Sequence, residues 1–449
     1  MSLVPFPQVH AEHGTAPHAD AALPRAPQTP EETGLPHTFL VELMGKAMYQ
    51  LGLTRLTELS QHLCLAATVV EAVCQFMRRE GLLEVVRRGP HDGDVQFELT
   101  QAGHARAADW LARNHYAGAA PVPLETYRAG VQTQSLATQP VDVQRVRAAF
   151  ADLVVSEELQ DLLGTALNSG RPVLLYGPSG AGKTYLAEHL QRLLFGRVAV
   201  PHAIYVHGEV VRVFDEHCHR PATDGPALHH GLDSRARADT RWVLCERPCV
   251  VSGGELTLEM LDLSFDPRAG YYEAPPHFKA NNGLFIVDDL GRQVVTPRAL
   301  MNRWIVPMER RHDYLMLRNG GKFKVPFDLA LVFSTNLHPR ELDDAAFLRR
   351  LGHKIRIGPV PLADYRRIFE RACDDEDIEF DVDAFDWLLQ QHAHERQPLL
   401  ACLPRDLTRL IASRAAYLSV RAQMSPELLD WAWAAYFGTP AHAEHNPQE

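Results

Sequence analysis

GPSGAGKT at residues 177–184 follows the apolar run Val173–Tyr176 and precedes the helical pattern YLAEHLQRLLFG. A glycine-rich turn ending in Lys-Thr between a strand and a helix predicts a phosphate-binding loop, because its main-chain N–H groups can turn towards an anion. Lys183 adds a positive charge for the phosphates, and Thr184 offers a hydroxyl to Mg²⁺. We therefore expect ATP and Mg²⁺ as cofactors. The nucleotide should contact Gly177, Pro178, Ser179, Gly180, Ala181, Gly182, Lys183, Thr184 and Tyr185.

A second acidic site follows in GLFIVDDLGR at residues 283–292. Leu284–Val287 is apolar enough for a central strand, and ligands of open α/β sheets bind where such strands end. Asp288 is expected to complete the Mg²⁺ site with Thr184. Asp289 is expected to orient or deprotonate the attacking water, because this step needs a carboxylate within hydrogen-bond reach.

The order of these motifs resembles the AAA+ ATPase family, over about residues 145–437. LALVFSTNLHP at 329–339 is similar to the family's sensor-1 strand, which gives Asn336 a place beside the γ-phosphate. CLPRDLTRLI at 402–411 looks like the start of the sensor-2 helix, with Arg405 directed at the same phosphate. The resemblance implies an ATP-hydrolysing enzyme.

DDAAFLRRLGHKIRI at 343–357 resembles the family's arginine-finger segment, in which Arg349 or Arg350 reaches the nucleotide of a neighbouring subunit. The resemblance thus implies a ring of identical subunits, expected to be a hexamer. The segment 314–325 is similar to a pre-sensor-1 hairpin, and 253–283 occupies the place of the helix-2 insert in MoxR-like and enhancer-type relatives. The chain departs from the family at Asp289, where glutamate is usual, and it has no GAFTGA-like string for contacting a sigma factor.

The fold class predicted is α/β: a three-layer P-loop core at 145–359 with a parallel sheet, and a helical lid at 360–438. Residues 1–35 and 439–449 are expected to be flexible tails, and 119–144, rich in Ala, Pro, Gln and Thr, to be a linker. Residues 36–118 show three helices, a hairpin and a fourth helix, which resembles a winged-helix domain.

The winged helix leaves two alternatives open. Arg78 and Arg79 end its third helix, and Arg87, Arg88 and His91 lie on the wing, where they could meet DNA phosphates. Acidic side chains stand among them, and the net charge of the chain is -11, so a protein-docking or structural role is favoured over DNA binding.

The composition narrows the cellular setting. No run of 18 apolar residues is present, no secretory signal pattern opens the chain, and the seven cysteines are scattered without a CxxC motif. We expect a cytoplasmic protein without membrane insertion or disulfides. HCHR at 217–220, with Cys245 and Cys249, is interpreted as structural rather than as a zinc site. YYEAPPHF at 271–278 fits a mobile gripping loop or a packed connection equally well.

Three functional hypotheses follow. The first is a ring-shaped ATPase that remodels an unidentified protein or protein complex. The second is a DNA-binding regulatory or loader ATPase, and the third is an ATP-dependent switch with little turnover, which the shorter side chain of Asp289 keeps open.

Overall fold

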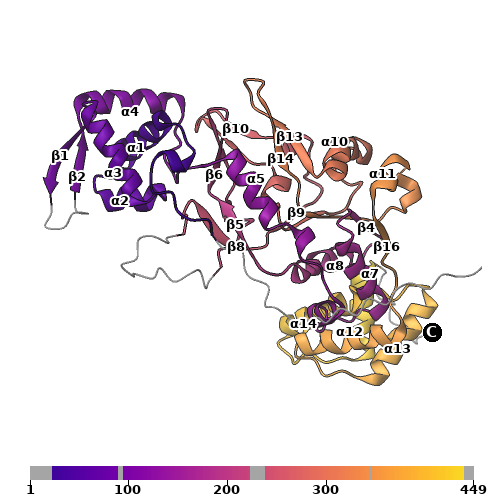
Figure 1. Cartoon of the computed structure of the whole chain (residues 1–449). Coiled ribbons are helices and arrows are strands. Elements are labelled where there is room, and N and C mark those ends of the chain that lie inside the picture. Colours follow the sequence, from indigo (N-terminus) through magenta and orange to yellow (C-terminus); the bar gives the residue numbers. More distant parts are fainter. Residues whose placement is uncertain (1–22, 89–94, 223–237, 343–344, 439–449) are drawn as a thin grey trace, which may run out of the picture.

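The computed structural model describes residues 23–88, 95–222, 238–342 and 345–438 (Figure 1). Its centre is a five-stranded parallel sheet in the order β16-β4-β15-β12-β9. The strands are β4 (Val173–Tyr176), β9 (Cys249–Ser252), β12 (Leu284–Val287), β15 (Ala330–Thr335) and β16 (His353–Arg356). Parallel strands need crossover connections, so this sheet carries helices on its faces.

Alternate residues of the central strands pack against different helices. Leu284 and Ile286 share one hydrophobic cluster with helices α6 (Val143–Ala149), α7 (Glu157–Asn168) and α8 (Lys183–His189). Phe285 and Val287 face the other cluster, which contains α10 (Pro297–Arg310) and α11 (Ala345–Arg350). The two clusters make the core a three-layer α/β structure, so the predicted fold class is confirmed.

Four helices close the chain as a separate bundle below the sheet in Figure 1. Their buried side chains form one cluster of their own, which includes Tyr365, Phe369, Leu407 and Trp433. The helices are α12 (Leu362–Asp375), α13 (Val382–His394), α14 (Leu403–Leu418) and α15 (Pro426–Phe437). This bundle occupies the position predicted for the lid.

Short strands interrupt the alternation of strands and helices that the sequence suggested. Between α8 and β9 the chain forms β5 (Arg197–Pro201), β6 (Ala203–Val206), β7 (Glu209–Arg212) and β8 (Trp242–Glu246). A second five-stranded sheet, ordered β10-β11-β7-β6-β3, adds β3 (Val122–Pro123), β10 (Ser264–Asp266) and β11 (Tyr271–Glu273). The expected hairpin at 314–325 is present as β13 (His312–Met316) and β14 (Lys322–Pro326). Below, β3, β5–β8, β10 and β11 are named the β insert.

The N-terminal domain has the element order predicted from the sequence. It contains α1 (His37–Leu51), α2 (Leu56–Leu63), α3 (Ala67–Arg79), β1 (Leu83–Arg88), β2 (Val95–Leu99) and α4 (Gln101–Arg113). Its hydrophobic core continues into the β insert through Ala203 and Val210, and Phe39 contacts Tyr205 with ring centroids 4.6 Å apart. The domain is therefore fixed to the body rather than separate from it.

Two segments differ from the flexible tail and linker that their composition predicted. Within 23–35, Ala26, Thr33 and Leu35 are buried, while residues 1–22 lie outside the described part of the chain, as do 439–449. Residues 119–144 contain β3, α5 (Leu124–Thr133) and the start of α6. Tyr127 and Val131, one helical turn apart on α5, are buried in the cluster of the β insert. Tertiary burial of these few apolar side chains overrides the polar composition.

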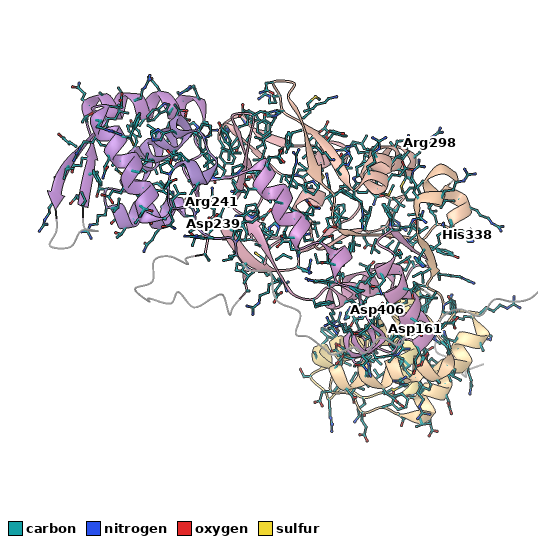
Figure 2. All side chains as sticks on the ribbon, viewed as in Figure 1. Asp161, Asp239, Arg241, Arg298, His338 and Asp406 are labelled. Atoms are coloured by element: carbon teal, nitrogen blue, oxygen red, sulfur yellow. The ribbon has the colours of Figure 1, made fainter. Side chains whose placement is uncertain are left out.

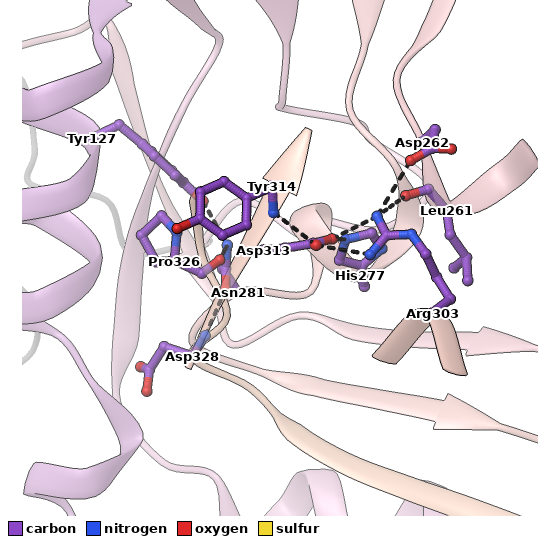
Figure 3. A network of polar contacts seen from close by, with 10 residues as sticks. All are labelled: Tyr127, Leu261, Asp262, His277, Asn281, Arg303, Asp313, Tyr314, Pro326 and Asp328. Atoms are coloured by element: carbon purple, nitrogen blue, oxygen red, sulfur yellow. Dashed lines mark hydrogen bonds and ion pairs between the residues drawn. The ribbon is translucent and has the colours of Figure 1, made fainter. Parts of the chain in front are cut away.

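Polar contacts attach α5 and the hairpin β13–β14 to the sheet (Figure 3). The Asn281 amide donates to Tyr127 Oη at 2.9 Å and accepts from Asp328 N at 2.9 Å. At the hairpin base, the buried carboxylate of Asp313 accepts from Arg303 at 2.8 Å and lies 3.0 Å from His277 Nε2. Burial acts to raise the pKa of Asp313, but hydrogen bonds and electrostatic attraction from His277 and Arg303 lower it to about 2.

Among the described residues, no single helix is both long and apolar enough to cross a membrane, and only the pair α2 and α3, bent by 116°, meets that test jointly by length and composition.

Candidate nucleotide site

The strand order brings the predicted motifs to one edge of the sheet. β15 lies between β4, which leads into the glycine turn, and β12, which leads into the two aspartates. Thr335 is paired with Tyr176, and Phe333 with Val287, so the carboxyl ends of the three strands lie close together. Asn336 follows β15 and therefore stands between the turn and the aspartates.

The glycine turn has a backbone that requires glycine. Gly177, Gly180 and Gly182 have φ values of 148°, 80° and 90°, outside the range that L-residues normally adopt. A Cβ on Gly177 would lie 1.8 Å from the carbonyl oxygen of Ile357, so a side chain cannot be accommodated there. The sequence thus folds into an open turn at the start of α8, as the motif predicted.

Lys183, Asn336 and Asp289 form a connected set of polar contacts. Lys183 Nζ donates to Asn336 Oδ1 at 2.6 Å and to the carbonyl oxygens of Gly177 and Pro178 at 3.1 and 2.9 Å. Asn336 Nδ2 donates to Asp289 Oδ1 at 3.3 Å. Lys183 is 6% exposed; burial lowers its pKa, while Asp289 and Asp288 act in the opposite direction. A cation held in this way is well placed for an anionic ligand.

Thr184, the residue after the lysine, contacts Asp288 directly. Thr184 Oγ1 donates to the Asp288 carboxylate, with both oxygens at 2.9 Å. Hydroxyl and carboxylate oxygens are the ligands that Mg²⁺ prefers, and Mg²⁺ sites commonly use one or two carboxylates together with substrate phosphates. These residues fit the predicted magnesium site.

A cleft of about 730 Å³ opens beside the turn. Ala181, Gly182 and Tyr185 line one wall, and residues 152–156, 353–361 and the start of α14 line the others. Arg405 lines this cleft with its side chain 54% exposed, beside Asp406 at 3.4 Å. The residue before α14 also touches the turn itself, because Cys402 N donates to Gly180 O at 3.1 Å. The cleft has the volume of a small-ligand site.

Arg349 and Arg350 lie away from this cleft, on α11. Both line a second cavity of about 660 Å³, together with Arg171 and Arg311. Arg350 Nε lies 2.7 Å from Glu309 Oε1, whereas the carbonyl oxygen of Arg349 accepts from Arg171 Nη2 at 2.8 Å. The structure therefore does not bring these two arginines to the glycine turn of their own chain.

Gln293 is a polar residue near the site that the motifs did not indicate. Its amide oxygen accepts from Gly291 N at 2.9 Å, and its Nε2 donates to the carbonyl oxygens of Asp288 and Gly253 at 2.8 and 3.2 Å. Gln293 sits four residues beyond Asp289 in a segment without periodicity, so only the folded turn reveals its contacts.

The remaining sequence interpretations concern residues outside the site. Both ring nitrogens of buried His219 are engaged, with Asp215 N at 3.0 Å and Lys279 O at 2.9 Å. Over the described ranges, no group of three or more His, Cys, Asp or Glu side chains is arranged to hold a metal ion. In YYEAPPHF, Tyr272, His277 and Phe278 are buried, so this segment is a packed connection.

The N-terminal domain presents few basic side chains on its third helix. Arg78 and Arg79 are exposed at the end of α3, and Arg87 is exposed on β1, while His91 and the side chain of Arg88 lie outside the described residues. At the start of α3, Thr68 Oγ1 donates to Gln28 O at 2.9 Å, so the N-terminal segment contacts this helix.

One family model and several solved structures match parts of the chain. A family model described as a domain of unknown function (DUF8689) matches residues 361–435, the helical bundle. No curated protein matches the chain. Solved structures that match include a point mutant of Thermotoga maritima RuvB, with 12% identity, a TM-score of 0.36 and coverage of 69% of this chain and 74% of that chain.

Two further structures match at similar levels. The Thermotoga maritima RuvB Holliday junction branch migration motor has 13% identity, a TM-score of 0.35 and coverage of 63% of this chain and 69% of its own. NtrX from Brucella abortus has 14% identity, a TM-score of 0.38 and coverage of 68% of this chain and 57% of its own. The fold and the candidate site rest on the strand order and contacts of the chain itself.

Proposed function

We propose that this chain is an AAA+ ATPase that binds ATP with Mg²⁺ and hydrolyses it. The observation that carries the proposal is a set of three contacts at one sheet edge: Lys183 to Asn336, Asn336 to Asp289, and Thr184 to Asp288. Lys183 and the N–H groups of the turn would hold the phosphates, and Thr184 with Asp288 would hold the metal. Bound Mg²⁺–ATP supplies the phosphoanhydride bond that is broken and the metal charge that stabilises the phosphate oxygens.

Asp289 and Asn336 support the chemical step in this proposal. The Asp289 carboxylate accepts a hydrogen bond from the water that attacks the terminal phosphate. The amide of Asn336 contacts both Lys183 and Asp289, so it fixes the distance between the phosphate-binding cation and the carboxylate. Arg405, at the wall of the cleft, would add a donor from the lid.

A turnover assay on the purified chain tests this proposal. Lys183→Ala should abolish ATP binding in a titration, because the buried cation and its contacts to the turn are lost. Asp289→Asn should bind ATP as tightly as wild type but release phosphate about 10²- to 10⁴-fold more slowly, since an amide cannot act as a base. If wild type and Asp289→Asn release phosphate equally slowly, the protein is an ATP-dependent switch rather than a turning-over enzyme.

We further propose that the subunits form a ring, expected to be hexameric, in which α11 faces the cleft of the next copy. The position of Arg349 and Arg350 away from their own glycine turn supports this arrangement. A finger supplied in trans increases the rate by roughly 10³–10⁵ in related systems. Arg349 is the better candidate, because its side chain is exposed whereas Arg350 is paired with Glu309.

Mixing inactive subunits tests the finger. Arg349→Ala and Lys183→Ala are each expected to be inactive alone. Their mixture should regain part of the turnover if an arginine from one copy completes the intact phosphate site of its neighbour. Arg350→Ala alone is the matched control, and it should keep its turnover because Arg350 is paired with Glu309. If Arg349→Ala is inactive and its mixture with Lys183→Ala shows no recovery, the trans arrangement fails.

The work performed is proposed to be the remodelling of a protein or protein complex. The shared core of the N-terminal domain and the β insert supports this, because hydrolysis at the sheet edge could then move both as one body. The alternative of DNA binding predicts a mobility shift with the full chain at about 50 mM salt, weakening as salt rises, because counterions are released from phosphates. If no DNA mobility shift is seen at low salt, the DNA-binding alternative fails and a protein client remains as the proposed substrate.

A further inference from the structure

Asp289 has a backbone conformation that its surroundings must maintain. Its φ is 50°, in the left-handed region that residues other than glycine seldom adopt, although aspartate tolerates it better than most. Such a conformation persists only where neighbouring contacts hold it, and it determines the direction of the side chain. The contacts around Asp289 therefore decide where its carboxylate lies.

The side of the turn nearest β15 is held by the main chain and a hydroxyl. Leu290 N donates to Ser334 O at 2.7 Å, and Thr335 Oγ1 donates to Leu290 O at 2.6 Å. These two bonds fix the residue after Asp289 against β15, the strand that Asn336 directly follows.

The opposite side of the turn is held by Gln293. Its carboxamide joins three main-chain groups, the N–H of Gly291 and the carbonyls of Asp288 and Gly253, at 2.9, 2.8 and 3.2 Å. Gly253 directly follows β9, so Gln293 connects the turn to the neighbouring strand. Gln293 is 8% exposed, and its amide supplies both donors and one acceptor in a place with little water to replace them. No carboxylate or aliphatic side chain of similar length can make all three bonds.

We propose that Gln293 is a positioning residue for the Asp289 carboxylate, holding the turn after β12 so that this carboxylate stays beside Asn336. The inference rests on the proposed ATPase function and adds to it a residue outside the recognised motifs. Gln293 bonds to Asp288 only through the Asp288 carbonyl, while Ser252 O holds the Asp288 N–H and Thr184 holds its carboxylate. Gln293 has no bond to Lys183, so its loss should affect the water-activating group and leave phosphate binding intact.

Gln293→Glu is the sharpest test, because it keeps the acceptor for Gly291 N and replaces both donors by an oxygen facing two carbonyls. The expected kcat of the purified chain falls about 10- to 100-fold, as is typical when an outer hydrogen-bond partner is removed. KM and the affinity for a fluorescent ATP analogue stay within about twofold of wild type. Gln293→Met, which is similar in length and uncharged, should likewise lower kcat and leave KM unchanged. This variant replaces Gln293→Glu in the test if Gln293→Glu does not fold.

Gln191→Glu is the matched control. Gln191 also donates its amide to a main-chain carbonyl, that of Arg247 at 3.2 Å, but lies away from the turn after β12. Its kcat should remain that of wild type.

The outcomes separate this inference from the proposed function. Wild-type turnover with normal kcat in both folded Gln293 variants overturns the positioning role alone. A parallel loss of kcat and nucleotide affinity would show a general structural role and also overturn it. If wild type neither binds nor hydrolyses ATP, the proposed function fails, and the inference fails with it.

Discussion

Charged side chains are buried both at the nucleotide-site edge and at the junction between the N-terminal domain and the β insert. The two regions differ in the hydrogen-bond and ion-pair partners of these charges. At the junction, labelled in Figure 2, Arg241 pairs with Asp239 at 2.8 Å and donates to the carbonyl oxygen of Thr33 at 3.0 Å. At the edge, Lys183 donates to neutral oxygens, and the Asp288 carboxylate accepts from a hydroxyl.

This difference indicates what each region contributes. The junction charges satisfy one another and are both almost fully buried, so they fix the structure. At the edge, Asp288 and Asp289 are neighbours in the chain, and Lys183 has no direct ion-pair partner among the contacts described. This arrangement lowers stability but leaves these charges available to a ligand. Substitutions at the junction should therefore change the free energy of unfolding, whereas substitutions at the edge should change turnover.

The largest effect is expected for Asp239→Ala. Removing one partner leaves Arg241 buried and uncompensated, which should lower the free energy of unfolding by about 3–5 kcal/mol. ATP affinity measured under native conditions should not change. Urea denaturation followed by tryptophan fluorescence gives the first quantity. Asp239→Leu combined with Arg241→Met should lower the free energy of unfolding by less than Asp239→Ala alone. The control is Glu370→Ala, which removes the exposed ion pair between Arg366 and Glu370 on α12 and should hardly change stability.

Asp288→Asn should have the opposite profile. Loss of the charge at the proposed metal site is expected to reduce magnesium-dependent turnover by about 10²- to 10³-fold. The melting temperature should stay close to that of wild type, because the asparagine keeps a side-chain oxygen that accepts from Thr184 Oγ1. A clear drop in melting temperature with turnover retained would break the comparison.

The base of the β13–β14 hairpin should behave like the junction. The pKa of Asp313 is lowered from 3.8 to about 2, so its contribution to stability is complete above about pH 5 and is lost as pH falls towards 2. A shift of about two units corresponds to roughly 2–3 kcal/mol. Urea unfolding of wild type and Asp313→Asn at pH 6 and pH 3 should show a stability difference that shrinks on acidification, whereas Asp262→Asn, at an exposed position, should give parallel values.

The smallest effect is expected at the surface of α5. Arg128 Nε and Nη2 both donate to the carbonyl oxygen of Lys324, Nε at 3.0 Å, and so link α5 to the hairpin, while Nη1 pairs with Glu125. Arg128→Ala should lower the free energy of unfolding by about 1 kcal/mol, the order expected for hydrogen bonds to a single carbonyl acceptor. Glu125→Ala, which removes the ion pair but leaves the bonds to Lys324 in place, is the control. Turnover should be unchanged in both, and a loss of turnover in Arg128→Ala alone would link α5 to the nucleotide site.

The glycine turn, Asp288, Asp289 and Asn336 could be predicted from the sequence because each follows a short apolar strand in a fixed local pattern. Parallel strands then bring those patterns together without further information. Gln293 could not be predicted, because its partners Gly253 and Asp288 are joined to it only by the folded sheet. The choice between Arg349 and Arg350 was open for the same reason, since their surroundings come from α10 and residues 169–171.

The predictions of a flexible tail and a linker were wrong for residues 23–35 and 119–144, because they rested on amino-acid composition and not on the spacing of apolar residues. Residues 23–35 and 119–144 are rich in small and polar residues, yet Leu35, Tyr127 and Val131 find apolar neighbours far away in the chain. The spacing of Tyr127 and Val131 by one helical turn was the available signal for α5. The β insert was only partly visible, because the hairpin β6–β7 shows local alternation, whereas β5 pairs with β8 across more than 40 residues.

The shared core of the N-terminal domain and the β insert has a consequence for dissection of the gene. A fragment comprising residues 36–118 would strip Phe39 and Tyr116 of the aromatic rings of Tyr205 and Tyr271, against which they rest in the whole chain. The exposed apolar surface of such a fragment would promote self-association, and binding assays on the fragment would then measure this self-association. Variants for expression should therefore keep residues 23–274 together with the rest of the chain.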